Sequence, residues 1–231
     1  VMNLRFFGRV GVTSDFLSKV GKAYEAMFVD GASIDSAKRA NFLSTVEDQH
    51  VFQLVGLLGP ENYLDTIDNR PGGSYEDNAT DYIWQLPNGG GEQIGEVIEH
   101  LLHTVTAVAM NLAFPDAWDY MNPSSSISLA TQEAINNGIY DVSSYAHIEG
   151  DTEGYKKVLA TEYAYWLILA EWDYFEIADK KQEGMSGNEE FNIGTSAEIA
   201  IQLPLGHQLY QDHIAKILSV PDSQLIRDLF P

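Results

Sequence analysis

Apolar residues recur mainly every three or four positions along this chain, which is the spacing of one face of an α-helix. The pattern predicts helices over residues 16–28, 34–58, 93–113, 128–137, 151–179, 206–218 and 223–230. Turn residues close several of these segments, as Gly59-Pro60 does for the second and Asn137-Gly138 for the fourth. The pattern therefore predicts a mainly helical protein.

One short segment has the composition of a strand instead. Residues 81–86 are rich in aromatic and β-branched side chains, whereas the stretches 61–80 and 182–196 are polar and are expected to be loops. No internal repeat or linker-like segment interrupts the chain. We therefore predict a mainly α fold with a small β element (α+β), in which an N-terminal helical subdomain, residues 1–60, packs as one unit with residues 61–231.

Composition narrows the class of protein. The chain has 231 residues, 45% of them hydrophobic, and carries a formal net charge of −21. Such an acidic chain is not expected to bind nucleic acid or an anionic membrane, because both need a basic surface. It contains no cysteine, which excludes disulfides, thiolate metal sites and cysteine nucleophiles. The acidic balance is also what solubility in a salty or calcium-rich medium requires. Acidic, cysteine-free chains resemble proteins that bacteria export in one step, and on that interpretation we expect an extracellular location.

The candidate chemistry lies in the segment Glu96-Val97-Ile98-Glu99-His100-Leu101-Leu102-His103. On a helix, Glu96, His100 and His103 fall within about 60° of one another, and Glu99 lies at the edge of the same face. The other positions of this helix are apolar almost all the way round, which is typical of a buried helix. Buried ionisable groups must pair, lose their charge or bind a metal. Two imidazoles with carboxylates match the ligands of zinc or a similar divalent ion.

A second buried carboxylate is expected on another helix. Glu162 has Val158 and Leu159 one turn before it and Tyr165 and Trp166 one turn after it, so it lies within an apolar stripe. A carboxylate in that position needs a partner. We expect it to reach the histidine face, either as a further metal ligand or as a hydrogen-bond acceptor for an imidazole.

A strand, a helix with a metal motif and a later helix bearing glutamate together resemble the gluzincin branch of the zincin metallopeptidases. Thr161-Glu162-Tyr163-Ala164 and the closing helix Leu205–Leu218 look most similar to lethal-factor-type zinc peptidases, over about residues 80–220. The motif departs from the family's His-Glu-x-x-His, since Glu99 and His100 are exchanged. The stretch Ile98–Thr104 also resembles uncharacterised marine bacterial proteins that are often attached to calcium-binding secretion repeats.

The resemblance implies a zincin-like helical domain and a peptidase-like hydrolase that cleaves peptide or protein with a zinc-activated water. It makes Glu96, His100, His103 and Glu162 the pool of metal ligands and Glu99 the general base. A competing arrangement pairs Glu99 and His103 as ligands four residues apart and leaves His100 in the position of the base.

Two other functions remain open at this stage. The same Glu/His cluster could be a structural feature of a non-catalytic domain that serves binding or assembly. Carboxylate and histidine ligands also suit redox iron or manganese, although the ferritin-like pattern needs two Glu-x-x-His helices and only one helix here carries the paired histidines. An open ligand position in a cleft would favour the hydrolase, and a closed cluster would favour the structural role.

Overall fold

The computed structural model of the protein describes residues 1–57 and 78–231. Its strands are β1 (Arg5–Gly8), β2 (Phe52–Leu57) and β3 (Tyr82–Gln85). Its longer helices are α1 (Ser14–Ala26), α2 (Ser36–Asp48), α4 (Gly90–His103), α7 (Ser126–Asn136) and α8 (Thr152–Glu171). The shorter helical segments are η2 (Thr104–Met110), α5 (Asn111–Ala113), α6 (Pro115–Trp118), η3 (Ser143–Ile148), α9 (Ser196–Gln202), α10 (Pro204–Leu209), η4 (Tyr210–Ile214), α11 (Ala215–Ile217) and α12 (Ser223–Leu229).

The three described strands form one parallel sheet in the order β1-β2-β3. Arg5 pairs with Phe52 in the first ladder, and Leu54 pairs with Tyr82 in the second. Parallel neighbours need a crossover connection, and α1 with α2 forms the connection between β1 and β2. The strand β3 leads directly into α4, so α4 packs back against the sheet.

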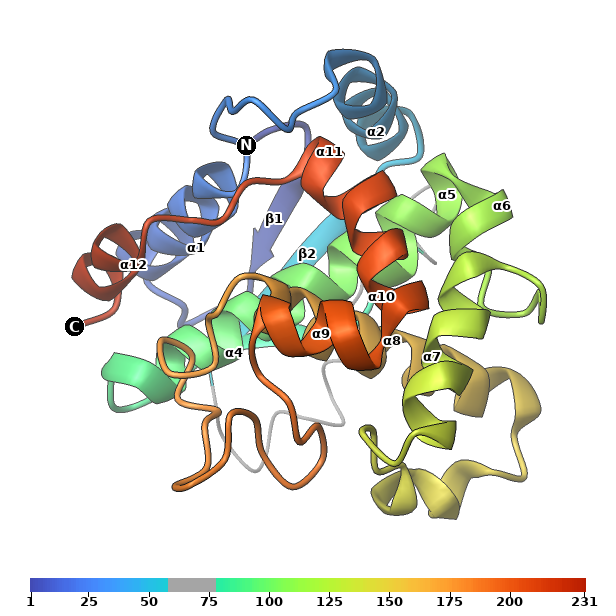
Figure 1. Ribbon diagram of the computed structural model, residues 1–231. Coiled ribbons are helices and arrows are strands. Elements are labelled where there is room, and N and C mark those ends of the chain that lie inside the picture. The colour runs from blue at the N-terminus through green and yellow to red at the C-terminus, as the bar shows by residue number, and fades with distance from the viewer. Residues whose placement is uncertain (58–77) are drawn as a thin grey trace.

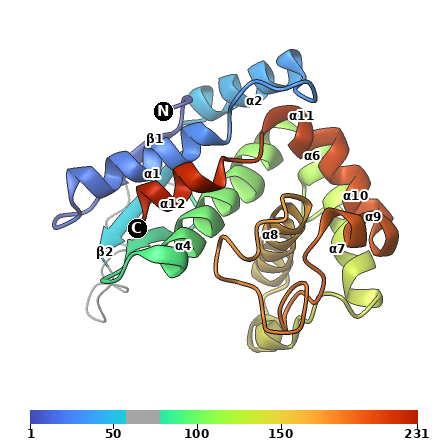
Figure 2. The ribbon, with the colours of Figure 1, turned by 60° about the vertical axis from the view of Figure 1, so that its left-hand side comes forward.

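The helix α4 occupies the centre of the molecule. It contacts β3 on one side and α8 on the other, while α1 and α12 lie side by side along its first half (Figures 1 and 2). Its residues Val97, Ile98 and Leu101 are fully buried, as are Leu167 and Ile168 of α8. The two histidines near the end of α4 therefore lie between a sheet and a second buried helix.

Local signals explain where α8 begins and how it is held. The side chain of Asp151 accepts a hydrogen bond from the Gly154 backbone N–H, which caps the helix. From Leu159 to Glu171 nearly every side chain is buried, because α4, α7 and α9 surround this helix. Glu162 is the only position within that run that is partly exposed.

The fold class predicted from the pattern is confirmed: the protein is mainly helical with a small sheet. The helix expected over 34–58 is wrong in its second half, because α2 ends at Asp48 and β2 follows. His50 between them adopts a left-handed backbone conformation with φ +56°, which ends the helix. Residues 52–56 are fully buried, so their apolar run fits a strand covered on both faces. The strand β1 and the helix α9 were not expected.

Residues 1–57 join the rest of the chain through this sheet. They contribute β1 and β2 beside the helices α1 and α2, and β2 forms its second ladder with β3. The core is also continuous, since Val20 and Phe42 belong to the same buried cluster as Leu101 and Leu169.

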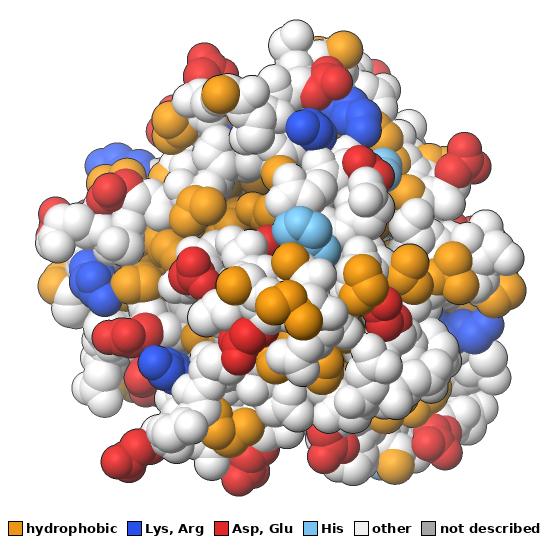
Figure 3. All heavy atoms as spheres, in the orientation of Figure 1, with side chains coloured by type: hydrophobic (Ala, Val, Ile, Leu, Met, Phe, Trp, Pro, Cys, Tyr) orange, Lys and Arg blue, Asp and Glu red, His pale blue; other side chains and the backbone are white. Residues whose placement is uncertain are grey.

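The face of the molecule shown in Figure 3 reflects the acidic composition. Acidic side chains are spread over the face shown in Figure 3 and outnumber the basic ones there. Among the described residues, no helix is both long and apolar enough to cross a membrane.

The backbone of residues 178–180 lies in close contact with α4. A Cβ atom added to Gly95 of α4 would lie 2.5 Å from the carbonyl oxygen of Ala178, and one added to Gly91 would lie 2.8 Å from Cβ of Asp179. The segment 178–180 therefore rests directly on α4 where that helix has no side chains. It can approach this closely only because both positions are glycine.

We expect Gly95→Ala to destabilise the protein by about 1–3 kcal/mol, because the new methyl group overlaps a backbone oxygen that cannot move independently. In an unobstructed helix the same change would be stabilising, since alanine is the better helix former. Urea unfolding measures the effect. Gly150→Ala is the matched control, since a Cβ atom there meets nothing within 4 Å. Equal stability of the two variants would contradict the close contact.

Candidate metal centre

The site is built on the last turns of α4. His103 is the last residue of α4, and a π-helical segment, Thr104–Met110, continues from it. Such π segments are rare and occur frequently at functional sites. His103 is 2% exposed and His100 is partly buried, so both imidazoles lie inside the protein. The ring of Tyr165 on α8 packs edge-on against His103, with 5.8 Å between the ring centroids.

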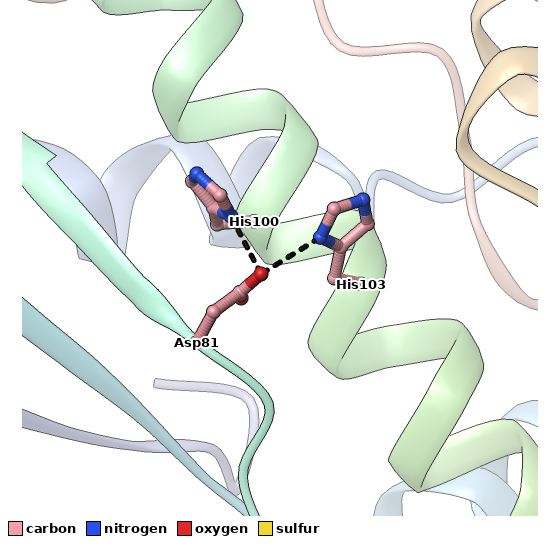
Figure 4. A group of neighbouring side chains, drawn as sticks. All are labelled: Asp81, His100 and His103. Atoms are coloured by element: carbon pink, nitrogen blue, oxygen red, sulfur yellow. Dashed lines mark hydrogen bonds and ion pairs between the residues drawn. The ribbon is translucent and has the colours of Figure 1, made fainter. Parts of the chain in front are cut away.

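Asp81 joins the two imidazoles. Its Oδ2 lies 3.0 Å from Nδ1 of His100 and 3.1 Å from Nδ1 of His103, so one carboxylate oxygen serves both rings (Figure 4). Asp81 immediately precedes β3, and the turn after β3 leads into α4. The strand–turn–helix hairpin therefore brings the beginning of the strand beside the end of the helix.

The outer nitrogens of both rings also face carboxylates. Nε2 of His100 lies 3.1 Å from Oε1 of Glu96, an oxygen that also accepts the Trp84 backbone N–H at 2.8 Å. Nε2 of His103 lies 3.4 Å from Oε2 of Glu162 on α8. This second contact is long, and Nε2 of His103 makes no hydrogen bond within the part of the chain that the structure describes. The two helices are thus bridged by an imidazole–carboxylate pair that is not tightly closed.

These surroundings control the protonation of the cluster. Burial alone would lower the pKa of His100, but Asp81 and Glu96 outweigh burial and raise that pKa to about 10. For His103, Glu162 and Asp81 outweigh burial in the same way and hold its pKa well above the usual value. Burial would raise the pKa of Asp81, but the two imidazoles hold it well below its ordinary range. Without a metal, these pKa shifts favour the charged forms of the two imidazoles and of Asp81.

A buried polar network fixes the position of Asp81. Its Oδ1 accepts the Thr80 hydroxyl at 2.9 Å, and its backbone carbonyl accepts the side-chain amide of Gln53 at 2.9 Å. Gln53 on β2 is fully buried and its Oε1 accepts the Thr104 hydroxyl at 2.6 Å. The sheet, Asp81 and the residue after His103 are thereby tied together, which sets the direction in which the shared oxygen points.

Two groups of side chains in the described ranges have the geometry to hold a metal ion. The first is Asp81, His100 and His103, and the second is Glu99, His103 and Glu162. In each group, the potential ligand atoms lie within 4.8 Å of one another. His103 belongs to both groups, because its two ring nitrogens face opposite sides: Nδ1 faces Asp81, and Nε2 faces Glu162.

The second group borders a cleft. An open cleft of about 640 Å³ is lined by Glu99 and Glu162 together with Tyr145, Trp166, Asp179, Lys180, Lys181, Gln182, Asn188, Glu189 and Glu190. On its wall, Oε1 of Glu190 accepts the Tyr145 hydroxyl at 2.6 Å and the Trp166 indole N–H at 3.2 Å. Burial, and then the nearby charges of Glu162 and Glu99, raise the pKa of Glu190 against the lowering effect of those two hydrogen bonds.

A more apolar pocket of about 350 Å³ lies elsewhere, between α7 and α8. Among its lining residues only Lys156 carries a charge. It therefore lacks the carboxylates and imidazoles that could hold a metal or transfer a proton, and the cleft beside Glu99 and Glu162 is the better candidate for chemistry.

The structure brings most of the sequence-predicted residues together. His100, His103 and Glu162 lie in one cluster, and Glu99 is in the group that borders the cleft, with its Oε2 2.8 Å from Nζ of Lys180. Glu96 contacts His100 but lies outside both metal-capable groups. Asp81 was not expected in the cluster, since the sequence placed it only at the start of the predicted strand, residues 81–86.

Simple geometry could have found Asp81. It lies four residues before Gln85, or about 13 Å along an extended strand. His100 lies ten residues after Gly90, or about 15 Å along a helix. In a strand–turn–helix hairpin these two lengths place Asp81 next to His100.

No protein-family model, no curated protein and no solved structure matches this chain. Its function must therefore be inferred from the chemistry of its own residues.

The raised pKa of His100 predicts how stability depends on pH in the presence of a chelator. Below about pH 6.5 the ring is charged in both the folded and unfolded chain, so its ion pairs contribute fully. As the pH rises through about 10, the folded protein loses that proton and the contribution disappears. We expect Asp81→Asn to melt well below wild type at pH 6 and to approach it at pH 10. A difference in melting temperature that is constant with pH would contradict this.

Proposed function

We propose that this protein is a metal-dependent hydrolase whose metal ion is held by Glu99, Nε2 of His103 and Glu162. The single observation that supports this most is the environment of His103. Its Nδ1 faces Asp81, while its buried Nε2 makes no hydrogen bond among the described residues and points toward two carboxylates at the edge of a cleft. Metal-binding histidines typically donate their other N–H to a carboxylate, as His103 would to Asp81.

The donor set fits zinc, which accepts histidine nitrogen and carboxylate oxygen and keeps one position open in catalytic sites. When bound, such an ion lowers the pKa of a coordinated water and polarises a carbonyl group. The protein's own residues supply the rest. Glu99 and Glu162 come from α4 and α8, so their separation depends on the packing of two rigid helices.

Glu190 is the residue that we propose as the proton acceptor. It lines the same cleft as Glu99 and Glu162 but lies outside the ligand group, and two hydrogen bonds hold its Oε1 in place. Its raised pKa brings it closer to the neutral range, where a carboxylate is most useful for accepting and returning a proton. Tyr145, which donates to Glu190, keeps the carboxylate oriented toward the cleft.

The proposed substrate is a peptide or protein, and the proposed location is extracellular. The first rests on the resemblance of residues 80–220 to gluzincin peptidases, and the cleft of about 640 Å³ offers room for a few residues of a chain. The second rests on the acidic, cysteine-free composition. In this proposal Glu99 is a metal ligand, as it is in the competing arrangement of the sequence motif. His100 is not a ligand, and it contacts Asp81, the carboxylate that orients His103.

A second candidate function is a non-catalytic domain with a structural Glu/His cluster. It is favoured by one observation: both nitrogens of His100 face carboxylates, Asp81 on one side and Glu96 on the other. Charged imidazoles between carboxylates form a network of ion pairs that would brace the sheet, α4 and α8 without any metal.

Metal content separates the two candidates. We expect purified wild type to bind zinc, His103→Ala to lose it, and Glu99→Gln to lose most of it. Asp81→Asn should weaken binding by about 10–100-fold, because it removes the group that orients His103. Glu96→Gln should bind like wild type, since Glu96 lies outside the ligand group. Metal analysis and calorimetric titration give these values.

Glu92→Gln, on the exposed side of α4, is the control for a general loss of negative charge. If Glu99→Gln keeps its metal while Glu96→Gln loses it, the ligands come from the other set, which is Glu96, His100, His103 and Glu162. If wild type binds no zinc, manganese or iron, the structural function is favoured.

Hydrolysis tests the role of Glu190. We expect Glu190→Gln to lower the rate of peptide cleavage by about 10²–10⁴-fold without loss of metal, because glutamine keeps the hydrogen bonds but cannot take a proton. A pool of fluorogenic peptides serves as substrate, and Glu189→Gln is the control on the same cleft. Full activity of Glu190→Gln with metal bound would show that another group accepts the proton.

A further inference from the structure

A lysine already forms an ion pair with Glu99. Nζ of Lys180 lies 2.8 Å from Oε2 of Glu99, with 32% of the Lys180 side chain and 21% of the Glu99 side chain exposed. Glu99 is one of the three residues that we assign to the metal, and the same ammonium group lines the cleft. Within the described residues, this is the only lysine or arginine in an ion pair with a member of that ligand group.

The backbone of Lys180 is held in place by contacts on both sides. Its N–H donates to the carbonyl of Phe175 at 2.8 Å, and its own carbonyl accepts the side-chain amide of Asn188 at 3.2 Å. Asp179 before it has φ +54°, an unusual conformation for a residue other than glycine. The backbone position of Lys180 is therefore fixed by the fold, unlike that of a residue in a freely exposed loop.

The stem of Lys180 follows a path along α4. A Cβ atom on Gly95 would lie 3.1 Å from Cε of Lys180, so the lysine passes over the helix about one turn before Glu99. The absence of a side chain at Gly95 lets the ammonium group reach the carboxylate. The close approach of residues 178–180 to Gly95 therefore also brings the positive charge of Lys180 to the site.

The positive charge of Lys180 offsets the repulsion between neighbouring carboxylates. Glu99 and Glu162 are brought within 4.8 Å of one another when they face His103, and Glu190 lies on the same cleft. Like charges in a partly buried site repel each other unless a cation lies between or beside them. The ammonium group of Lys180 supplies such a cation from within the chain.

We propose that Lys180 is a stand-in cation: its ammonium group holds Glu99 in the metal-free protein, and a divalent ion displaces it when it binds. This inference rests on the ligand set of the proposed function. Displacement leaves the ammonium group in a cleft that also contains Glu189 and Glu190, so an acidic environment remains available to it. Metal binding is then an exchange of cations, which weakens the apparent affinity and favours ions that bind strongly enough to replace the lysine.

The test compares wild type with Lys180→Met, which keeps most of the aliphatic stem and removes the charge. We expect the metal-free variant to melt at a lower temperature, because Glu99 and Glu162 lose their internal cation. We expect it to bind Zn²⁺ about tenfold more tightly, since the ion no longer displaces a positive charge beside it. Lys181→Met is the matched control, because Lys181 lines the same cleft but is exposed. Calorimetry with Zn²⁺ in a competing chelator gives the affinities.

The outcomes separate this inference from the proposed function. If wild type binds Zn²⁺ and Lys180→Met binds it no more tightly, the exchange is overturned while the metal centre stands. If tighter binding also appears in Lys181→Met, the effect is one of general charge, and the specific exchange is again overturned. If neither wild type nor Lys180→Met binds Zn²⁺ or Mn²⁺, both proposals fail. Lys180→Gln provides the same comparison if Lys180→Met does not fold.

Discussion

One oxygen atom of Asp81 faces two imidazoles at the end of a buried helix, and the arrangement of the site depends on that contact. An imidazole inside an apolar core is costly unless each of its polar atoms has a partner. Because Asp81 takes the Nδ1 side of both rings, their Nε2 atoms must face outward, to Glu96 in one case and to Glu162 in the other. The shared carboxylate thus determines which side of His103 is left for a ligand.

The same contact couples the sheet to the helices. Asp81 is held by Thr80 and by Gln53 of β2, while His103 reaches Glu162 on α8. A displacement of β3 relative to α4 would therefore move the imidazoles relative to the cleft. The fully buried apolar residues around α4, such as Ile98 and Leu101, resist that displacement because a close-packed core leaves no room for a small shift.

Charge is distributed unevenly between the two sides of His103. On the Asp81 side, two imidazoles lie in short ion pairs with two carboxylates, Asp81 and Glu96, which is the arrangement of a structural network. On the Glu162 side, two carboxylates, a long contact and an internal lysine border an open cleft. This asymmetry is the physical reason for placing the proposed chemistry on the cleft side, and it assigns the Asp81 side to orientation.

Periodicity alone determined that α4 is buried and that Glu96, Glu99, His100 and His103 share one region of its surface, because the helical repeat fixes which residues neighbour each other. It also indicated that Glu162 lies in a buried stripe. It failed for residues 51–57, where an apolar run fits a strand as well as a helix and only pairing with β1 and β3 decides between them. Periodicity gave no sign of Asp81, Lys180 or Glu190, which the tertiary structure adds to the site. Their places depend on the hairpin between β3 and α4, on a backbone crossing at Gly95 and on a loop that folds against α8, and these contacts between distant segments leave no periodic trace in the sequence.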